Sequence, residues 1–149
     1  MLLFPKGDGS KFTFDIWLPY PPTVNRYWRQ FNGRTILSRE ARAYRKSVPA
    51  AKTDQPLIGD LAIGLIVIPP DRRRRDLDNI FKALFDAMQY RQYFLDDSQI
   101  SAIFAIKSEP NKEHPGVWVG LKQLERVTNV LQQIEPNHLL LFRPGNDVP

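Results

Sequence analysis

The sequence predicts one α/β (α+β) domain, with a small mixed β-sheet and two main helices in the order β-α-β-α-β-β. Three observations lead to this prediction. Residues 12–18 alternate apolar and polar side chains, as a half-buried strand does. Residues 61–68 form a continuous apolar run that is typical of a central strand. From Leu77 to Met88, apolar side chains recur every three or four positions, which is the spacing of an amphipathic helix.

The first half of the chain supplies one strand and one helix. Prolines at 19, 21 and 22 end the first strand, because proline lacks the amide hydrogen that a sheet needs. Residues 25–34 are predicted to form a polar, aromatic and basic loop, with a turn at Asn32 and Gly33. Ser38 is the predicted N-cap of an alanine-containing helix that Pro49 ends or kinks.

The second half of the chain supplies the rest of the sheet. Pro69 and Pro70 stop the central strand, and the helix from Leu77 follows them. Residues 100–107 and 117–121 have the composition of two further strands. Beyond them lies a C-terminal extension, in which the apolar positions from Leu124 to Ile134 favour a further helix.

The composition excludes several classes of protein. The 149 residues suffice for one domain with one sizeable core. The chain has no cysteine, so it forms neither disulfides nor thiolate metal sites, and a reducing cytoplasm suits it. No apolar run approaches the roughly 18 residues that span a bilayer, and the N-terminus lacks the features of a signal peptide. We therefore expect a cytoplasmic protein with no membrane partner.

The net charge of +5 is unevenly distributed. Residues 1–50 carry nine Lys or Arg against three Asp or Glu, whereas residues 51–100 carry seven against eight. Positive charge is thus concentrated near the N-terminus and lies beside an acidic cluster in the middle of the chain. This distribution suits a nuclease better than a surface that merely keeps the protein in solution.

The acidic residues suggest a metal site. Asp76 and Asp78 are one residue apart, and in an extended segment side chains at that spacing point to the same side. Seven extended residues, at roughly 3.3 Å each, are enough to return Asp97 to the start of the helix. Clustered carboxylates repel one another, and a hard cation such as Mg²⁺ or Mn²⁺ removes that penalty. Such a cation activates water for phosphodiester hydrolysis, in a site formed within one chain or across a dimer.

Each of these acids also has a purely structural interpretation. Asp76 is suited to cap the helix, and Asp78 to complement the helix dipole. Asp96 and Asp97 together are suited to a solvated turn. Lys82 lies four residues after Asp78, which is the spacing of an ordinary ion pair on a helix surface, and Asp86 then continues the same row. His114 and His138 are isolated and are assigned no catalytic role.

Basic residues occur in two segments that are suited to DNA. Four adjacent arginines at 72–75 repel one another, and Asp71 and Asp76 can neutralise only part of that charge, whereas a phosphate backbone does so better. Residues 25–34 mix aromatic and basic side chains, which suits phosphate contact with base stacking or a wedge at an opened junction. Trp28 is equally suited to a core position. The predicted DNA-binding residues are Arg72, Arg73, Arg74, Arg75, Asn25, Arg26, Tyr27, Arg29 and Arg34.

These motifs resemble the signature of the RusA family of Holliday-junction resolvases. The resemblance rests on Asp-Arg-Arg-Arg-Arg-Asp-Leu-Asp-Asn at 71–79, on Lys82 and on Phe-Leu-Asp-Asp at 94–97, with support from Pro-Pro at 21–22 and Asn-Arg-Tyr at 25–27. It runs from about residue 12 to residue 122 and implies a RusA-like domain over 1–123. Residues 124–149 form an extension, which we expect to pack on the same domain. It implies catalytic roles for Asp76, Asp78, Asp97 and Lys82, a metal site made of the three aspartates with Asp96 as a secondary ligand, and Mg²⁺ as the cofactor, for which Mn²⁺ substitutes.

The resemblance further implies a homodimer that cuts four-way DNA junctions with paired, symmetric nicks in recombination and repair. Two alternatives are compatible with the residues alone. One is a non-catalytic, basic DNA-binding module in which the aspartates serve as helix caps. The other is a nuclease for other branched DNA. The extension from residue 124 matches nothing in the family signature, and it leaves the dimer interface and the accessibility of the DNA-binding face open.

Overall fold

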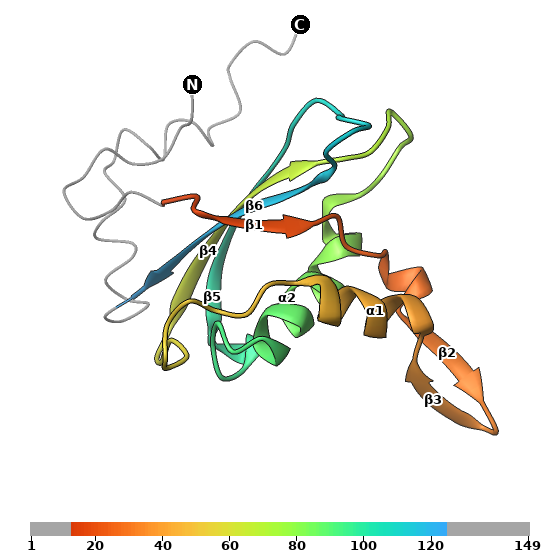
Figure 1. Ribbon diagram of the computed structural model, residues 1–149, viewed down its shortest axis with the longest axis horizontal. Helices are drawn as coiled ribbons and strands as arrows, with labels where there is room; N and C mark the ends of the chain where they lie inside the picture. Colours follow the sequence, from red (N-terminus) through yellow and green to blue (C-terminus); the bar gives the residue numbers. More distant parts are fainter. Residues whose placement is uncertain (1–12, 125–149) are drawn as a thin grey trace, which may run out of the picture.

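A computed structural model describes residues 13–124 and confirms the predicted α+β class. Four strands form a mixed sheet in the order β1 (Ile16–Pro19), β6 (Gly116–Gln123), β4 (Leu61–Ile68) and β5 (Ile100–Lys107). The β4–β5 pair is parallel and the other two pairs are antiparallel (Figure 1). Parallel neighbours need a crossover connection, and the segment that contains the second helix supplies it.

Strand β4 is the centre of the sheet and has the bounds that its apolar run predicts. It is paired on both edges, with β5 on one side and β6 on the other. Alternate residues from Leu61 to Val67 belong to the main hydrophobic core. Ala62 and Gly64, which point to the other face, are also buried. Burial on both faces explains why this strand is continuously apolar rather than alternating.

Helix α1 (Arg39–Ser47) begins and ends where the sequence predicts. The hydroxyl of Ser38 accepts a hydrogen bond from the amide of Ala41 at 3.0 Å, so Ser38 is the N-cap. Val48 has an extended backbone and precedes Pro49, which ends the helix. The helix buries Ala41 and Tyr44, and the Tyr44 hydroxyl donates to the carbonyl of Pro19 at 2.9 Å.

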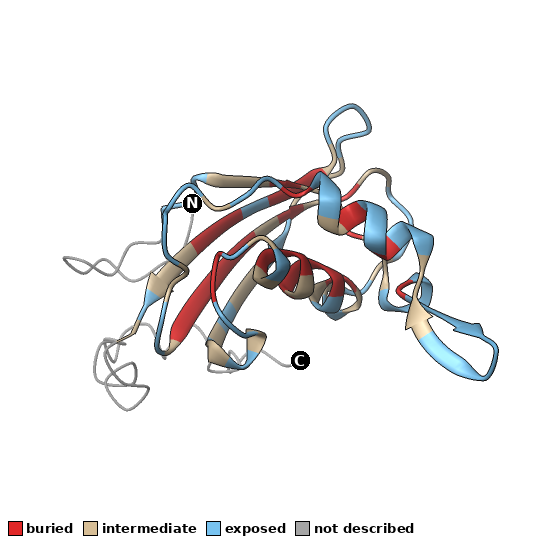
Figure 2. Ribbon diagram, turned by 60° about the horizontal axis from the view of Figure 1, so that its bottom comes forward, coloured by how far each residue is buried: buried red, intermediate tan, exposed pale blue. Residues whose placement is uncertain are grey.

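Helix α2 (Phe81–Tyr90) follows a short 3-10 turn, η2 (Leu77–Ile80), so the predicted helix starts with a tighter first turn. Its buried residues are Ala83, Leu84, Phe85, Ala87 and Met88. Helices α1 and α2 contact each other, and both contribute to the same hydrophobic core as one face of the sheet. Figure 2 shows the buried stripes of the strands facing these helices.

The predicted loop at 25–34 is wrong, because most of this segment is a β-hairpin. After a 3-10 turn, η1 (Val24–Arg26), strand β2 (Trp28–Phe31) pairs with β3 (Arg34–Leu37) in antiparallel fashion. The predicted turn at Asn32 and Gly33 is confirmed, with φ angles of 47° and 72°. Positive φ at both central residues is the geometry that joins two strands by a two-residue loop. Every residue of β2 is exposed, so the segment lacks the alternation that reveals a half-buried strand.

Two smaller differences concern the ends of strands. Strand β1 is shorter than the predicted 12–18 and includes Pro19, which lies on the edge of the sheet. Strand β6 extends beyond the predicted 117–121 at both ends. The predicted helix in the extension lies outside the described residues, apart from Leu124. No helix within 13–124 is long and apolar enough to cross a membrane.

Replacing Tyr44 by Phe tests the burial of its hydroxyl through pH. Burial raises the pKa of Tyr44 far above its ordinary value of 10.0, so the folded chain keeps a proton that the unfolded chain loses at high pH. The hydroxyl therefore stabilises the fold fully below about pH 10, and this contribution falls by about 1.4 kcal/mol per pH unit above that value. Near neutral pH, we expect urea unfolding to give wild type a free energy of unfolding about 1 kcal/mol higher than that of Tyr44→Phe. About one pH unit above 10, this difference in stability should shrink or change sign. The same difference at both pH values would contradict the burial of the Tyr44 hydroxyl.

Candidate active site

The acidic pair predicted to hold a metal lies at the start of the α2 segment. Asp76 has an extended backbone and occupies the N-cap position of η2, but its side chain makes no capping hydrogen bond. Asp78 lies inside the 3-10 turn and is exposed. Neither carboxylate takes part in a hydrogen bond or an ion pair within the described part of the chain. The capping interpretation therefore does not account for Asp76.

Lys82 lies one helical turn beyond Asp78 and contacts two acids. Its ammonium nitrogen is 3.0 Å from Oδ1 of Asp86 and 3.9 Å from Oδ2 of Asp97. The return of Asp97 to the helix thus takes place within one chain, at the first turn of α2. The Lys82 side chain remains 43% exposed, so it can still reach a bound phosphate. Two of the four predicted catalytic residues are therefore side by side.

Asp86 connects this pair to the interior of the protein. Its side chain is only 12% exposed. The Tyr27 hydroxyl donates a hydrogen bond to Oδ2 of Asp86, and the guanidinium of Arg45 lies 3.6 Å from the same oxygen. Arg45 also donates to the Tyr27 hydroxyl at 3.0 Å. Oδ2 of Asp86 is thus shared by Tyr27, at the end of η1, and by Arg45 of α1. Oδ1 of Asp86 binds Lys82 of the same helix.

The place of Tyr27 corrects the prediction that it contacts DNA. Its ring is 1% exposed and belongs to the hydrophobic core, so it is not available to a base. Burial, together with the hydrogen bond to Asp86, raises the pKa of Tyr27 to about 12. The hydroxyl therefore stays protonated and remains a donor at physiological pH. Its neighbour Trp28 is 45% exposed, so the core position considered for that residue is also wrong.

Asp96 and Asp97 form a turn in which the two carboxylates have different roles. Asp96 is the N-cap of η3 (Asp97–Gln99): it accepts from the Ser98 amide at 3.3 Å, and this bond lowers the pKa of Asp96. Gln99 completes a capping box. Partial burial and the neighbouring Asp96 raise the pKa of Asp97, although the Lys82 ammonium opposes the shift. The structural interpretation accounts for Asp96, whereas Asp97 is directed at Lys82.

The arginine run forms an ordered loop between β4 and η2. Arg75 is held by Asp71 through two hydrogen bonds, one of them 2.9 Å long, and the Arg75 carbonyl accepts from Lys107 of β5 at 2.9 Å. The same guanidinium holds the pKa of Asp71 well below its usual range. Asp71 thus neutralises Arg75, as the structural alternative proposed, but Asp76 takes no part. The side chains of Arg72 and Arg73 make long ion pairs, with Glu109 at 3.6 Å and with Asp71 at 3.8 Å, and stay largely exposed.

The remaining basic residues predicted to bind DNA lie on η1 and the hairpin. Asn25 and Arg26 are exposed in η1, where Arg26 lies 3.7 Å from Glu40. Arg29 and Arg34 are exposed on β2 and β3. Arg74 is exposed in the arginine loop. Apart from Tyr27, every residue predicted to contact DNA therefore has an accessible side chain or, for Arg75, a role in shaping the loop.

The donor set matches a hard divalent cation in its chemistry. All the candidate ligands are carboxylate oxygens, which Mg²⁺ and Mn²⁺ prefer. The carboxylates of Asp76 and Asp78 lack competing partners. However, no three acidic or imidazole side chains within 13–124 converge closely enough to form an assembled metal site. The three-carboxylate arrangement expected for Asp76, Asp78 and Asp97 is therefore not formed in this structure.

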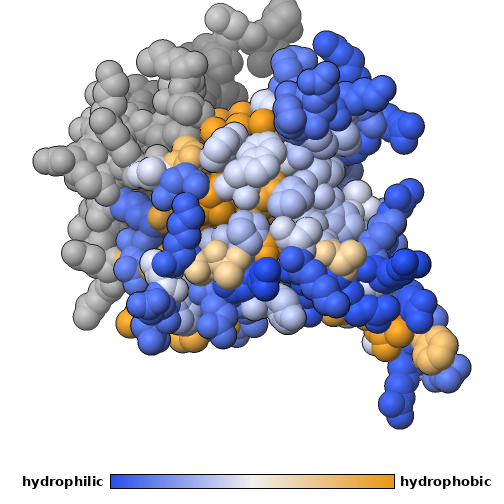
Figure 3. Space-filling view, in the orientation of Figure 1, coloured by the Kyte–Doolittle hydropathy of each residue, from blue (hydrophilic) through white to orange (hydrophobic). Residues whose placement is uncertain are grey.

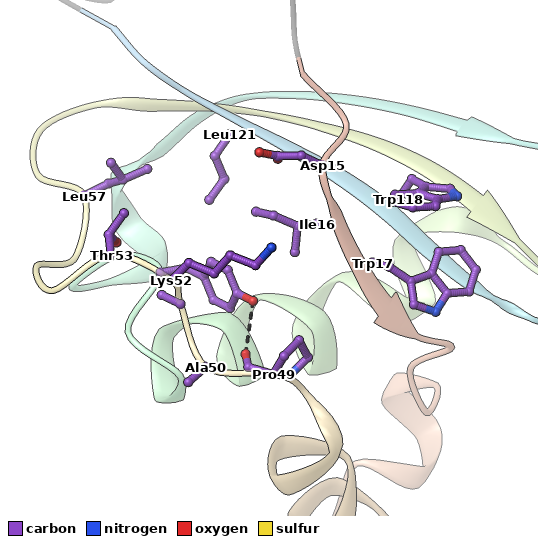
Figure 4. A pocket seen from close by; sticks show the side chains of 12 residues that line it. Asp15, Ile16, Trp17, Pro49, Ala50, Lys52, Thr53, Leu57, Trp118 and Leu121 are labelled. Carbon is purple, nitrogen blue, oxygen red and sulfur yellow. Dashed lines mark hydrogen bonds between the residues drawn. The ribbon is translucent and has the colours of Figure 1, made fainter.

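Two cavities lie near these elements, and they differ in chemistry. A shallow depression of about 300 Å³ is lined by Arg45, Asp86, Gln89, Tyr90 and Leu95 and so adjoins Lys82 through Asp86. A larger cavity of about 460 Å³ lies between β1 and the segment after α1 (Figure 4). There the Tyr93 hydroxyl donates to the carbonyl of Pro49. The larger cavity contains none of the predicted catalytic residues, so the depression next to Asp86 is the one that belongs to the site.

Comparison with known proteins places the chain in a family. The family model described as "Endodeoxyribonuclease RusA" matches residues 19–122. A crossover junction endodeoxyribonuclease RusA from Shigella sonnei is 42% identical over 104 residues, which are 67% of this chain and 87% of the relative. Proteins of the same name from Escherichia coli and Enterobacteria phage 82 are 42% and 41% identical over the same length. The chain belongs to the RusA family.

Replacing Tyr27 by Phe tests the network around Asp86. The substitution removes one donor from a mostly buried carboxylate and one acceptor from Arg45, so we expect a loss of about 1–3 kcal/mol in the free energy of unfolding. Tyr90→Phe is the matched control, because the ring of Tyr90 lies 5.7 Å from the Arg45 guanidinium but is 55% exposed. Its effect should stay within about 0.5 kcal/mol. If urea unfolding gave the two variants equal stabilities, Tyr27 would not support Asp86.

Proposed function

We propose that this chain is an endodeoxyribonuclease that cuts four-way DNA junctions by Mg²⁺-dependent hydrolysis of phosphodiester bonds. The observation that carries the proposal is the placement of Lys82 beside Asp97, one turn after two acidic side chains that have no structural partner. The relatives are named crossover junction endodeoxyribonucleases, which supports the substrate. A cytoplasmic setting remains a prediction.

The chemistry divides among the acidic residues and the lysine. Asp76 and Asp78, joined by Asp97 and with Asp96 as a secondary ligand, would hold Mg²⁺, which lowers the pKa of a bound water and shields the phosphate. The Lys82 ammonium brings positive charge to the scissile phosphate, where negative charge builds up during cleavage. Asp86 limits the freedom of Lys82, because its Oδ1 holds the Lys82 ammonium at 3.0 Å. Lys82 is thereby kept within reach of Asp97.

Binding of DNA would use the basic residues on both sides of these acids. The exposed guanidinium groups of Arg72, Arg73 and Arg74 are suited to the phosphate backbone. Arg75 has a structural role instead. Its guanidinium binds Asp71 and its carbonyl accepts from the Lys107 ammonium, and these contacts fix the loop. Asn25 and Arg26 add a second contact surface next to the hairpin.

A homodimer follows from the symmetry of the substrate. A four-way junction has approximate two-fold symmetry, and two coordinated cuts need two active sites. Because Lys82 and Asp97 meet within one chain, each protomer would carry its own pair of these residues. A sedimentation mass near one chain, maintained on junction DNA, would contradict the dimer.

A nuclease fits the structure better than a non-catalytic DNA-binding module. The module requires the aspartates to act as helix caps, yet Asp76 makes no capping bond and only Asp96 is used in that way. Action on other branched DNA is a second candidate, because an exposed basic surface does not by itself select a four-way junction. Labelled junction, flap and duplex DNA, each with Mg²⁺ or EDTA, distinguish these substrates.

Asp76→Asn is the variant that tests the proposal. The amide keeps the size of the side chain but removes a negative ligand, so we expect junction cutting in Mg²⁺ to fall by at least roughly 100-fold. Binding should persist or tighten, because one charge that repels phosphate is gone. The matched control is Asp54→Asn, an exposed aspartate in the segment before β4. Cutting at the wild-type rate by Asp76→Asn would show that the metal site is wrongly assigned.

A further inference from the structure

The β2–β3 hairpin projects from the body of the protein as a two-stranded arm (Figure 1). Its strands pair only with each other, and they form a sheet separate from the main one. All four residues of β2 are exposed, together with Asn32, Gly33, Arg34 and Thr35. An isolated two-stranded hairpin is only marginally stable in water, so the arm depends on the contacts at its base.

The two faces of the arm differ. Side chains alternate along a strand, so Trp28 and Gln30 share one face with their partners Leu37 and Thr35. This face is tied to the protein or to itself: Leu37 packs against the core, Trp28 lies edge-on to the buried Tyr27 with 4.8 Å between ring centroids, and Gln30 donates to Thr35 at 2.8 Å.

The opposite face carries an aromatic ring among cations. Phe31 lies directly across from Arg34, and the guanidinium carbon of Arg29 is 5.4 Å from the centre of the Phe31 ring. Phe31 is 54% exposed. Neither arginine forms an ion pair with an acid in the described part of the chain. In Figure 3 the arm, at the lower right, shows hydrophobic atoms surrounded by strongly hydrophilic ones.

This face is chemically suited to an exposed nucleobase. An aromatic ring stacks on a base, while guanidinium groups on either side contact the flanking phosphates. A two-fold contact between two copies through the same face would bring the arginines of one copy close to those of the other, which is unfavourable. In a continuous duplex the faces of the bases are covered by their neighbours. A base at a crossover has fewer stacking neighbours and is the more accessible one.

The base of the arm is connected to the candidate active site. The Ser38 amide donates to the Tyr27 carbonyl at 2.9 Å, and the Ser38 hydroxyl donates to the Arg26 carbonyl at 2.6 Å, so the two ends of the hairpin are closed together. The Tyr27 side chain then donates to Asp86, which also binds Lys82. The position of the arm is thus set by the same residues that hold Lys82.

We propose that the arm stacks Phe31, between Arg29 and Arg34, on an exposed base at the crossover of the DNA junction. This inference rests on the proposed function and extends it, since it assigns the selection of junctions over duplex to one ring outside the acidic site. Positioning by Tyr27 and Asp86 would then set the distance between the base that the arm holds and the phosphate that is cut.

The experiment measures binding without cleavage, in EDTA, with a synthetic four-way junction that carries 2-aminopurine beside the crossover and with a matched duplex. Wild-type binding should raise the fluorescence of this base, because a base that moves onto a protein ring leaves its neighbours in the DNA. Phe31→Ala should lose most of this rise and bind the junction about tenfold more weakly, with little change on the duplex. Phe31→Tyr keeps the ring and should retain both properties.

Two sets of variants separate stacking from other effects. Ile58→Ala removes another exposed apolar side chain, in the segment before β4, and should bind the junction as wild type does. Arg29→Ala and Arg34→Ala should weaken junction and duplex binding alike, and each should lower the salt dependence of log K by about one.

Three results would overturn the inference. The first is unchanged junction binding and fluorescence in Phe31→Ala. The second is an equal loss of affinity for junction and duplex in this variant. The third is a sedimentation mass of Phe31→Ala that differs from that of wild type, which would mark the arm as a contact between two copies. The first of these, with normal Mg²⁺-dependent cutting by wild type, would leave the proposed function standing. Absence of cutting by wild type with any metal would instead remove the proposed function, whether or not Phe31 stacks.

Discussion

The shared carboxylate of Asp86 is the interaction on which the arrangement of this protein depends. It lies almost out of solvent, where an unpaired charge is costly, and it is satisfied by Tyr27, Arg45 and Lys82. Those partners come from the base of the hairpin, from α1 and from α2. The residues that close the core therefore also orient the lysine of the candidate active site. Substitution of Tyr27 or Arg45 is therefore expected to alter the position of Lys82 as well.

Around this centre, acidic and basic side chains lie on different elements. Asp76 and Asp78, which have no structural partner in the described part of the chain, lie at the start of the α2 segment, after β4 and the arginine loop. Exposed basic side chains lie on the arginine loop and on the hairpin. Neighbouring acids in the turn at 96–97 also differ in role: Asp96 caps the turn, whereas Asp97 reaches Lys82. Contacts such as that of Asp71 with Arg75 fix the arginine loop, while the side chains of Arg72 and Arg73 stay largely exposed.

Much of the fold was accessible from the sequence, because burial leaves a pattern. The apolar run of β4, the spacing along α2 and the serine before α1 each predicted an element that the structure confirms. The hairpin was missed because every residue of β2 is exposed, which leaves no alternation to detect. Asp86 was taken for another charge in a surface row, since its spacing from Lys82 is that of an ordinary helix pair. Its partner Tyr27 is 59 residues away, and only tertiary structure brings the two together. Chain length allowed Asp97 to return to the start of the helix, but its contact with Lys82 within one chain emerged only from the structure.

Whether these residues form a metal-dependent site that cuts four-way junctions can be decided by mapping nicks in Mg²⁺. The substrate is a synthetic junction that is labelled in turn on each of its four strands. We expect paired nicks at symmetric positions in two opposing strands near the crossover, with none in EDTA and none on matched duplex. Cutting that is equally frequent on duplex, or no cutting of the junction with any divalent metal, would contradict it.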